Sequence, residues 1–358
     1  MKKAIITGVT GQDGSHMADY LLANTDIEVI AGVRRLSVKN HNNIEHLKDN
    51  PRFKLIDLDV TDQHNVDRVI REEKPDYFIN FAANSFVGTS WKMPVNHMET
   101  NCMAVLYQLC AIAEHVPNCR YYNAGSSEEF GDIVAAPQDE THPLRPRSPY
   151  GASKAAARHL VKVWRDSYDL YAVQGWLFNH EGVRRGEEFL TRKVTKGVAD
   201  IFWKDSIGDK FKPLQLGNIE AKRDWSDAED FVDGIWRMLN QEHYLSETIG
   251  VDLEIGKLTP KEYVLASGET HTIREFVEAA FAYAGYGAEK CRWIGEGLNE
   301  KYFHGNDVLV EINPEFYRPA EVDLLLGDPS LAEKELGWKR KTDFYGLVKK
   351  MLDNDVRS

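Results

Sequence analysis

A phenol and an amine stand four residues apart in this sequence, at Tyr150 and Lys154. On a helix, side chains four positions apart lie on one face, so the two groups would be neighbours. An ammonium group beside a phenol stabilises the phenolate and brings the phenol pKa from about 10 toward neutrality, which makes a usable base. Ahead of the pair, Ser126, Ser127 and Glu128 add two hydroxyls and a carboxylate. The pair also fits an interfacial tyrosine beside a solvated lysine, so its role depends on whether the rest of the chain builds a site around it.

The N-terminal segment has the pattern of a dinucleotide-binding turn. An apolar run from Lys3 to Thr7 is typical of a strand, and an amphipathic stretch from His16 to Leu22 is typical of a helix. Between them, glycines at three-residue spacing would let backbone amides and the helix N-terminus approach a pyrophosphate. Because strand, glycines and helix occur in the required order, we predict dinucleotide binding rather than ordinary turn glycines. The predicted contacts are Gly8, Thr10, Gly11, Gln12, Asp13 and Gly14.

The end of the second predicted strand, Glu28 to Val33, indicates which dinucleotide is bound. A site for NAD usually has a carboxylate here, which binds the ribose 2′-hydroxyl. This chain has Arg34 and Arg35 instead. Two guanidinium groups suit a 2′-phosphate, so we predict NADP as the cofactor, with a solvated basic turn as the alternative.

Strands and helices alternate through the first half of the chain, which predicts an α/β fold with a doubly wound parallel (Rossmann) sheet. Beyond the second strand, the pattern predicts strands at 53–58, 77–81, 120–124 and 171–177, and helices at 62–71, 94–114 and from 150 onward.

Sheets of this kind bind ligands at the carboxyl ends of their strands. Asp59 and Val60 are therefore expected to meet the adenine, while Ala82 and Ser85 lie along the cofactor. The cluster from Ser126 to Glu128 ends the next strand. This position favours a catalytic role for the phenol and the amine.

Beyond residue 177 the alternation gives way to polar, basic loops. Basic residues recur in separate segments, which together could line a cleft for a second phosphorylated ligand, although each alone fits a solvated surface. We expect a smaller, interleaved C-terminal substrate-binding domain, with residues 1–178 plus 224–268 binding NADP and residues 179–223 plus 269–358 binding the substrate. His180 has no partner at metal-ligand spacing, so we expect it to form structural hydrogen bonds and expect no metal site.

The composition is that of an ordinary globular protein, with 358 residues of which 42% are hydrophobic and 28% charged. A net charge of −12 argues against a nucleic acid partner. The four cysteines show no CxxC spacing, which favours reduced thiols and a cytoplasmic location. No apolar run is long enough to cross a membrane, and the first ends at Gly8, too early for a signal peptide, so we expect no membrane partner.

Together these residues resemble a known family. Glycines at 8, 11 and 14 with Tyr150 and Lys154 are similar to the extended short-chain dehydrogenase/reductase superfamily. The segment 7–15 and five further motifs resemble the GDP-mannose 4,6-dehydratases more specifically, over nearly the whole chain. The five motifs are Asn179-His-Glu-x-x-Arg-Arg-Gly186, Thr191-Arg-Lys193, Leu216-Gly-Asn218, Arg223-Asp-Trp225 and Tyr317-Arg-Pro-Ala-Glu321.

The resemblance implies roles for individual residues. Ser126 takes the hydroxyl position of the catalytic triad, and Glu128 takes the position of the acid/base glutamate. Tyr150 takes the position of the redox base and Lys154 that of its partner. Tyr150 and Lys154 are also implied to contact the cofactor. The resemblance further implies that the loop at 34–35 helps to build a homo-oligomer, a dimer or tetramer. The side chains implied to face the nucleotide-sugar are Ser85, Ser127, Asn179, Lys193, Arg223, Arg318 and Glu321.

The chain departs from the family pattern in three places. Where the family typically has Ser-Thr-Ser-Glu-Leu-Tyr-Gly, residues 125–131 read Gly-Ser-Ser-Glu-Glu-Phe-Gly. A serine hydroxyl can replace that of threonine, but Glu129 and Phe130 are expected to remodel the wall beside the sugar. Extra residues also occur around 205–213 and 243–261.

The implied reaction is nucleotide-sugar 4,6-dehydration. Oxidation at C4 makes the C5 proton acidic, water is eliminated across C5 and C6, and the hydride returns to C6, which gives a 4-keto-6-deoxy sugar. The same reaction on a GDP-heptose or another nucleotide-sugar, a same-fold epimerase and a non-catalytic NADP-binding protein are the alternatives. The residues point to hydride chemistry through Tyr150 and Lys154, and to dehydration through Glu128.

Overall fold

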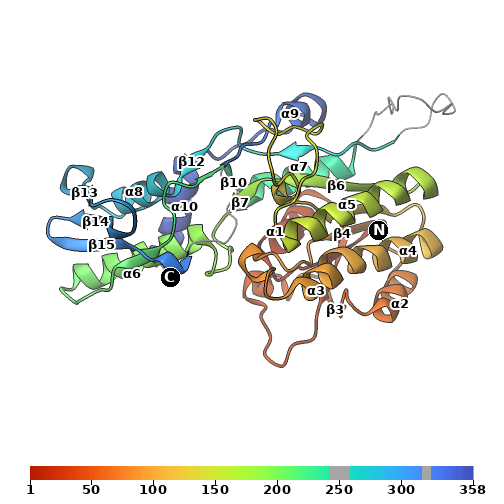
Figure 1. Cartoon of the computed structure of the whole chain (residues 1–358). Coiled ribbons are helices and arrows are strands. Elements are labelled where there is room, and N and C mark those ends of the chain that lie inside the picture. The colour runs from red at the N-terminus through yellow and green to blue at the C-terminus, as the bar shows by residue number, and fades with distance from the viewer. Residues whose placement is uncertain (242–258, 317–323, 358) are drawn as a thin grey trace.

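The computed structural model describes residues 1–241, 259–316 and 324–357. It has two lobes, a larger one built on a central sheet and a smaller one that contains much of the C-terminal third of the chain (Figure 1). Within the described residues, no helix has the length and apolarity needed to cross a membrane.

Seven parallel strands form the central sheet, in the order β11-β6-β5-β4-β1-β2-β3. This order confirms the predicted doubly wound sheet, and it reverses on either side of β1, where such sheets bind ligands. The strands predicted from the sequence are present, with ends within one residue of their expected positions. Their bounds are β1 Lys3–Thr7, β2 Glu28–Val33, β3 Phe53–Asp57, β4 Tyr77–Asn80, β5 Arg120–Ala124 and β6 Ala172–Leu177. The seventh strand, β11 (Val264–Leu265), was not predicted.

Helices cover both faces of this sheet. On one face lie α1 (Gln12–Asn24) and α7 (Ala228–Leu239), and on the other lie α2 (Gln63–Glu73), α4 (Ala104–His115) and α5 (Pro149–Tyr168). Two layers of helices around a parallel sheet are the architecture that the strand–helix alternation predicts.

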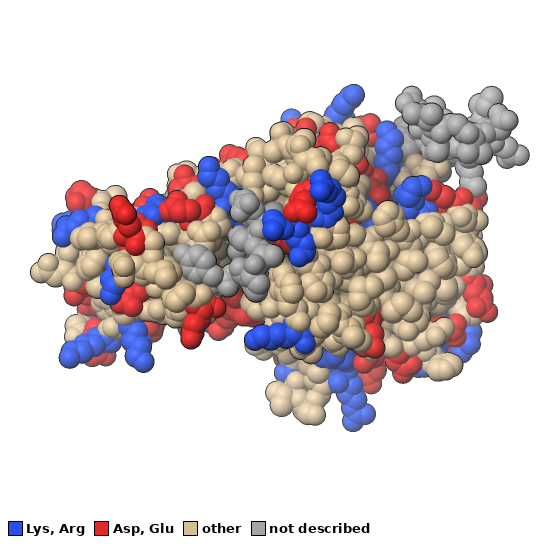
Figure 2. Space-filling view, in the orientation of Figure 1, with Lys and Arg blue, Asp and Glu red and all other residues tan. Residues whose placement is uncertain are grey.

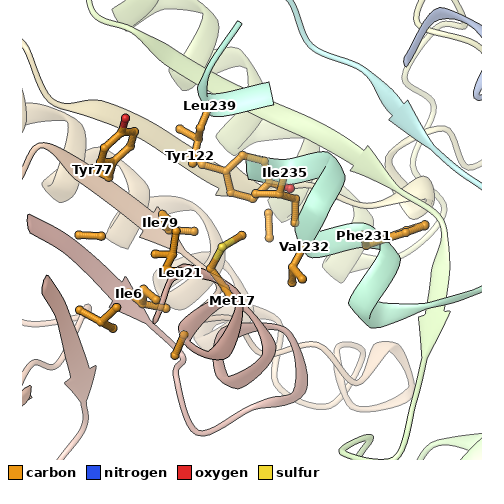
Figure 3. Close-up of a cluster of buried hydrophobic side chains, with 14 of the residues drawn as sticks. Ile6, Met17, Leu21, Tyr77, Ile79, Tyr122, Phe231, Val232, Ile235 and Leu239 are labelled. Atoms are coloured by element: carbon orange, nitrogen blue, oxygen red, sulfur yellow. The ribbon is translucent and has the colours of Figure 1, made fainter. Parts of the chain in front are cut away.

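The alternation of side chains along each strand sorts them between the two layers. Ile6, Ile79 and Tyr122 pack toward α1 and α7, where they meet side chains such as Leu21 and Ile235 (Figure 3). Their immediate neighbours Ile5, Phe78 and Tyr121 belong to the core on the opposite face. Each fully buried side chain of this kind contributes about 1.5–3 kcal/mol, so both layers hold the sheet firmly.

The helix predicted at 94–114 is interrupted. It consists of α3 (Pro94–Met98), one π-helical turn (Glu99–Met103) and α4, which continue one another along the chain. A π turn inserts one residue per turn and is not encoded by the apolar pattern that predicted the helix.

The smaller lobe packs three helices on a four-stranded sheet. Its core joins Val198 of the first helix, Phe276 of the second and Leu347 of the third to Val310 of the sheet. The elements are α6 Leu190–Ser206, α8 Ile273–Tyr283, α10 Phe344–Arg357, β8 Leu214–Leu216, β13 Cys291–Ile294, β14 Lys301–His304 and β15 Asp307–Ile312.

Short strands connect the lobes. β7 (Asn179–Glu181) pairs in parallel with β10 (Trp225–Asp227), which corrects the expectation of a loop throughout 178–187. A second group joins β9 (Lys222–Arg223) to β12 (His271–Thr272) and β16 (Leu324–Leu325).

Late segments of the chain also return to the larger lobe. After α9 (Ser330–Leu336), the indole of Trp338 is buried in the core beneath α7 and donates a hydrogen bond of 2.8 Å to the Asp230 carbonyl oxygen. Of the two extra segments, 205–213 consists of the last two residues of α6 and the chain that leads from it toward β8, whereas most of 243–261 lies outside the described residues.

Candidate active site

The glycine turn after β1 brings two stretches of backbone into contact. Gly8 has a φ of +65°, a left-handed conformation that favours glycine. A Cβ atom on Gly14 would lie 2.4 Å from the Gly8 carbonyl oxygen, so no larger residue fits there. Among the described side chains, none caps the N-terminus of α1. The first amides of the helix therefore face the turn, an arrangement that suits an anion.

A cavity of about 690 Å³ extends from this turn along the ends of the neighbouring strands. This size is within the usual range for ligand sites in proteins. Basic side chains from 34–41 and the peptide edges of 81–85 complete the lining. Apart from the phenol–amine pair, all residues predicted to bind the cofactor line this cavity. They are Gly8, Thr10, Gly11, Gln12, Asp13, Gly14, Arg34, Arg35, Asp59, Val60, Ala82 and Ser85.

The catalytic loop follows β5. Ser126 caps a short 3₁₀ turn, Ser127–Glu129, and its hydroxyl accepts a hydrogen bond of 3.2 Å from the Glu128 amide. The N-terminus of α5 packs closely on this turn, since a Cβ on Gly151 would lie 2.4 Å from the Glu128 carbonyl oxygen. The turn and the helix are therefore held at one fixed separation.

Helix α5 presents Tyr150 and Lys154 on one face, as their spacing predicts. The helix begins at Pro149, and the Ser148 hydroxyl caps it by accepting a 3.0 Å hydrogen bond from the Gly151 amide. The Lys154 Nζ atom lies 5.9 Å from the centre of the Tyr150 ring and donates a 2.7 Å hydrogen bond to the Ala124 carbonyl oxygen. Lys154 thus binds the end of β5 to the helix.

Burial dominates the electrostatics of this pair. Removal from water raises the pKa of the Tyr150 phenol, and its hydrogen bond with Ser126 acts in the opposite direction with a smaller effect. Burial also lowers the pKa of the Lys154 ammonium to about 8. The protein's own groups therefore do not bring the phenol pKa toward neutrality, which corrects that prediction, because desolvation of the phenolate is the largest contribution.

A second cavity, of about 160 Å³, adjoins the first. Side chains predicted for catalysis and for the substrate line it together: Ser85, Ser126, Ser127, Glu128, Tyr150, Lys154, Asn179 and Arg223. The Oδ1 atom of Asn179 is buried and has no hydrogen-bond partner among the described residues, so it can accept a bond from a ligand. Lys193 does not line this cavity, and its ammonium lies 3.3 Å from the centre of the Phe316 ring. Arg318 and Glu321 lie outside the described residues.

Sequence reasoning assigned no ligand contact to Arg185, whose side chain lines both cavities. Its guanidinium stacks 3.7 Å from the centre of the Phe189 ring and forms an ion pair with Glu181. The position of Arg185 within the motif 179–186 was the available signal, but the spacing alone does not say where the side chain points.

His180 forms the structural hydrogen bonds expected of it. Its Nε2 atom lies 2.9 Å from the Asp13 carboxylate and its Nδ1 atom 2.7 Å from the Phe178 carbonyl oxygen. Because both partners are acceptors, these contacts favour the ring with both nitrogens protonated. Burial acts to lower the pKa of His180, but the Asp13 carboxylate outweighs it and the pKa is raised. The ion pair joins the glycine turn to β7.

Glu129 and Phe130 do not form a wall beside the sugar, which corrects that expectation. Glu129 is fully buried behind the turn, and its carboxylate pairs with Arg158. The Phe130 ring packs on Trp176 at a centroid distance of 5.7 Å, within the core of the larger lobe. Adjacent residues of a tight turn point in different directions, so only Glu128 of the pair of glutamates reaches the cavity.

A parallel Rossmann sheet with a glycine turn at β1 and a tyrosine–lysine pair beyond β5 defines the class of short-chain dehydrogenase/reductase-type proteins. The chain is similar in structure to a dTDP-glucose 4,6-dehydratase from Streptomyces venezuelae, with a TM-score of 0.78 and 22% identity over 98% of this chain and 96% of that one. It is similar also to a UDP-glucose 4-epimerase from Thermus thermophilus, with a TM-score of 0.75 and 23% identity over 99% of this chain and 98% of that one. At these identities the likeness shows the fold.

Sequence comparison narrows the class to one family. The GDP-mannose 4,6 dehydratase family model matches residues 5–351. A GDP-mannose 4,6 dehydratase from Drosophila melanogaster is 40% identical over 99% of this chain and 86% of its own length. The human protein of that name is 38% identical over 99% of this chain and 91% of its own length. One from Vibrio cholerae is 36% identical over 99% of this chain and 94% of its own length. The chain belongs to the GDP-mannose 4,6-dehydratase family.

Proposed function

We propose that this protein is a hydro-lyase that converts GDP-mannose to GDP-4-keto-6-deoxy-mannose with NADP as a catalytic cofactor. The observation that carries the proposal is the joint lining of one cavity by Ser126, Glu128, Tyr150 and Lys154. The tyrosine and lysine serve hydride chemistry in general, whereas elimination of water needs the additional carboxylate of Glu128. The named activity of the relatives supports the same reaction and the same sugar nucleotide.

The residues of the larger cavity fit NADP. The glycine turn and the uncapped start of α1 suit the pyrophosphate, and Arg34 and Arg35 suit a 2′-phosphate. A structurally similar protein, RMD from Pseudomonas aeruginosa, was solved with NADPH, while the dehydratase from Streptomyces venezuelae was solved with NAD. When bound, the cofactor would supply the hydride acceptor for C4 of the sugar and the hydride donor for C6.

Tyr150 and Ser126 act on the oxygen at C4. In this proposal the Tyr150 oxygen accepts the proton of the 4-hydroxyl, while the Ser126 hydroxyl donates a hydrogen bond to the same oxygen and orients it. Lys154 holds a positive charge close to the phenol and stabilises its ionised form when the substrate excludes water. Because burial raises the pKa of Tyr150, the phenolate that takes this proton forms only when ligands occupy the site, after the phenol has released its own proton to solvent.

Glu128 carries the elimination. Once C4 is a ketone, the C5 proton is acidic, and the Glu128 carboxylate removes it. The same group then gives a proton to the departing 6-hydroxyl, which leaves as water. Return of the hydride to C6 needs a proton at C5, and the proton that Tyr150 took from the 4-hydroxyl supplies the balance, so both residues end the cycle in their starting forms. Ser127 lines the same cavity and supports the leaving hydroxyl.

The nucleotide end of the substrate would extend toward the smaller lobe. Asn179 and Arg223 line the cavity on that side, and we propose Lys193, Arg318 and Glu321 as further contacts. In this view, residues 1–178 plus 224–268 hold the cofactor and residues 179–223 plus 269–358 hold the sugar nucleotide. The packing of Trp338 under α7 assigns at least that residue to the core of the cofactor side.

We also propose that the protein acts in the cytoplasm as a homo-oligomer. All four cysteines are free thiols, which suits a reducing compartment. Charged side chains of both signs are interspersed on the surface, whereas an uncharged expanse covers the larger lobe around α3 to α5 (Figure 2). Exposed apolar side chains on these helices include Val95, Met98 and Val163. Size-exclusion chromatography with light scattering tests the oligomeric state.

Product analysis tests the function directly. The enzyme is incubated with GDP-mannose and NADP⁺, and proton NMR is used to look for a C6 methyl doublet, which appears only after dehydration. Parallel reactions contain GDP-heptose and UDP-, CDP- and dTDP-sugars. A methyl signal from GDP-mannose at the highest turnover supports the proposal, and an epimerised sugar with an intact 6-hydroxyl contradicts it.

The structure removes one reason to favour a heptose. That alternative depended on an altered wall at Glu129 and Phe130, and both side chains are buried away from the cavity. Structural similarity to epimerases does not favour epimerisation either, since it reflects the shared fold. Glu128 beside the hydroxyls distinguishes dehydration from both epimerisation and simple cofactor binding.

A further inference from the structure

We propose that Glu129 is a positioning residue, which holds the loop of Ser126 and Glu128 in register with the Tyr150 helix from behind. The inference rests on the proposed function for its kinetic consequences, but its structural basis is independent of the substrate. Glu129 touches neither cavity, so any effect on the reaction must pass through the residues that it binds.

The Glu129 carboxylate forms three hydrogen bonds in a fully buried position. Its Oε1 atom accepts a bond of 2.8 Å from the Ser126 backbone amide and one of 3.0 Å from the Gln174 side-chain amide. Its Oε2 atom accepts a bond of 2.5 Å from Arg158 Nε. A buried carboxylate with every oxygen engaged has one orientation, so it fixes the Ser126 backbone relative to Gln174 and Arg158.

Arg158 extends this constraint to the catalytic helix. It lies four residues beyond Lys154 and eight beyond Tyr150 on α5, so the three side chains form one row along the helix. The guanidinium stacks 3.5 Å from the centre of the Trp176 ring and also binds Glu262 at 2.9 Å. Its own geometry is therefore determined by contacts outside the loop.

The loop has no room to move relative to this pair. A Cβ on Gly125 would lie 2.8 Å from both the Arg158 Nη2 and Glu129 Oε1 atoms and 2.2 Å from the Gly175 carbonyl oxygen. The backbone that leads into Ser126 thus rests directly on the ion pair.

A row of buried amides connects Glu129 to the cofactor turn. Thr7, Asn80, Asn123 and Gln174 are paired in register on β1, β4, β5 and β6. The Thr7 hydroxyl donates to Asn80 at 2.5 Å, Asn80 to Asn123 at 2.7 Å and Asn123 to Gln174 at 2.7 Å. Gln174 in turn donates to Glu129.

All donors in this row point the same way, and the row ends on a carboxylate. Such chains polarise their members cooperatively, so the negative charge of Glu129 strengthens the whole series. Thr7 immediately precedes Gly8 of the glycine turn. The row therefore sets the catalytic loop and the cofactor turn at a fixed distance across four strands.

Two paired variants separate the hydrogen bond to Ser126 from the buried charge. In Glu129→Gln/Arg158→Met, the amide oxygen at position 129 can still accept from the Ser126 amide and no guanidinium is left unpaired. In Glu129→Leu/Arg158→Met, that acceptor is missing while the charge is equally removed. Because a shift of about 1 Å in a catalytic group can cost about 100-fold in rate, we expect kcat to differ by about 10- to 100-fold between the two, with KM for GDP-mannose within about threefold.

Exchange of backbone hydrogens gives a readout that needs no substrate. We expect the peptide that contains Ser126 to exchange much faster in Glu129→Leu/Arg158→Met than in Glu129→Gln/Arg158→Met. Glu262→Gln is the matched control for loss of a buried carboxylate, since it removes the charge of one Arg158 partner but leaves Arg158 bound to Glu129 and stacked on Trp176, and leaves the bond from the Ser126 amide to Glu129 intact. It should lower the melting temperature and leave kcat per folded molecule within about twofold of the parent.

Equal kcat values and equal exchange at Ser126 in the two double variants would overturn the proposal, as would a kcat loss in Glu262→Gln as large as in the leucine variant. If the leucine variant does not fold, Glu129→Gln alone decides. Its single amide oxygen can serve Arg158 or the Ser126 amide but not both, so kcat must fall or the exchange at Ser126 must rise. Parental values of both contradict the proposal. Should the parent not dehydrate GDP-mannose, the proposed function fails, and the exchange comparison still decides this inference.

Discussion

The two adjoining cavities of this protein are built in different ways. The cavity of about 690 Å³ is lined by a glycine turn and the ends of parallel strands, with basic side chains from 34–41 beside them. The cavity of about 160 Å³ is shaped by side chains from segments as far apart as Ser85, Tyr150 and Arg223.

The difference determines what each cavity needs from the rest of the fold. Backbone held by strand pairing keeps its position whatever side chains it carries, so the larger cavity depends on a few glycines. Side chains keep their positions only when others support them, and Ser126 has that support from Glu129 and Arg158. Changes in the smaller cavity should therefore affect turnover, and changes in the larger one should affect cofactor affinity and stability.

Tyr150→Phe should have the largest effect. Loss of the phenol oxygen removes the acceptor for the 4-hydroxyl proton, so kcat should fall by about 10³-fold, within the range for a general base. Reduction of the cofactor in a single turnover, followed by absorbance, should be lost to the same degree. Cofactor affinity measured by calorimetry should stay within about twofold, and a tenfold change would mean that the two cavities are not separable in this way.

Glu128→Gln should come next. The amide cannot take the C5 proton, so formation of the methyl product should fall by about 10²-fold or more while oxidation at C4 continues. Reduced cofactor should then accumulate with substrate, which distinguishes this variant from Tyr150→Phe. Release of keto-deoxy sugar at the parental rate would show that another group performs the elimination.

Replacing Arg34 and Arg35 together by alanine should act on the larger cavity alone. Loss of charge-assisted bonds of about 1.5–3 kcal/mol should weaken NADP⁺ by about 10- to 150-fold. The affinity for NAD⁺ should be unchanged, because NAD⁺ lacks the phosphate. Titration of both dinucleotides measures the ratio, and equal losses for the two would contradict recognition of a 2′-phosphate.

Gly14→Ala tests the backbone cradle. The added Cβ would lie 2.4 Å from the Gly8 carbonyl oxygen and 2.6 Å from the Val9 Cα atom, which cannot move aside. We expect a loss of about 3 kcal/mol in the free energy of unfolding and weaker cofactor binding. Gly182→Ala is the control, since its Cβ would meet nothing closer than 3.6 Å, and equal destabilisation of both would argue against a special fit at Gly14.

Lys154→Met should have the smallest effect on stability and the clearest pH dependence. The pKa of Lys154 is about 8 in the folded protein and 10.5 as the ordinary value, so burial of the ammonium costs stability. The cost is fully present below pH 8, where Lys154 is charged in both the folded and the unfolded chain. It declines between pH 8 and pH 10.5, because in this range the folded protein has lost the proton that the unfolded chain still holds. We expect the variant to be more stable by about 2 kcal/mol at neutral pH, after loss of the bond to Ala124. Denaturation at several pH values should show the gap closing as pH rises, and a constant gap would contradict burial as its cause.

Features carried by local spacing were predictable. The glycine turn, the strands with their alternating side chains and the helical i, i+4 relation of Tyr150 and Lys154 all depend on residues close together in the chain. The order of strands and helices then placed their ends at one edge of a parallel sheet, which predicted the residues of the cofactor cavity and the Ser126–Glu128 loop. Asn179 and Arg223 were expected only from the family resemblance, and Arg185, which lines both cavities, was not assigned.

Only the tertiary structure decided what lies opposite each side chain. Glu128 and Glu129 are adjacent and chemically alike, yet one reaches the cavity and the other is buried against Arg158, because a tight turn directs them apart. The Lys154 ammonium binds the Ala124 carbonyl, and the Asp13–His180 pair joins segments 167 positions apart. Residue types and spacing specify which groups are available, but burial and distance between remote segments determine their pKa values and partners, and these exist only once the chain is folded.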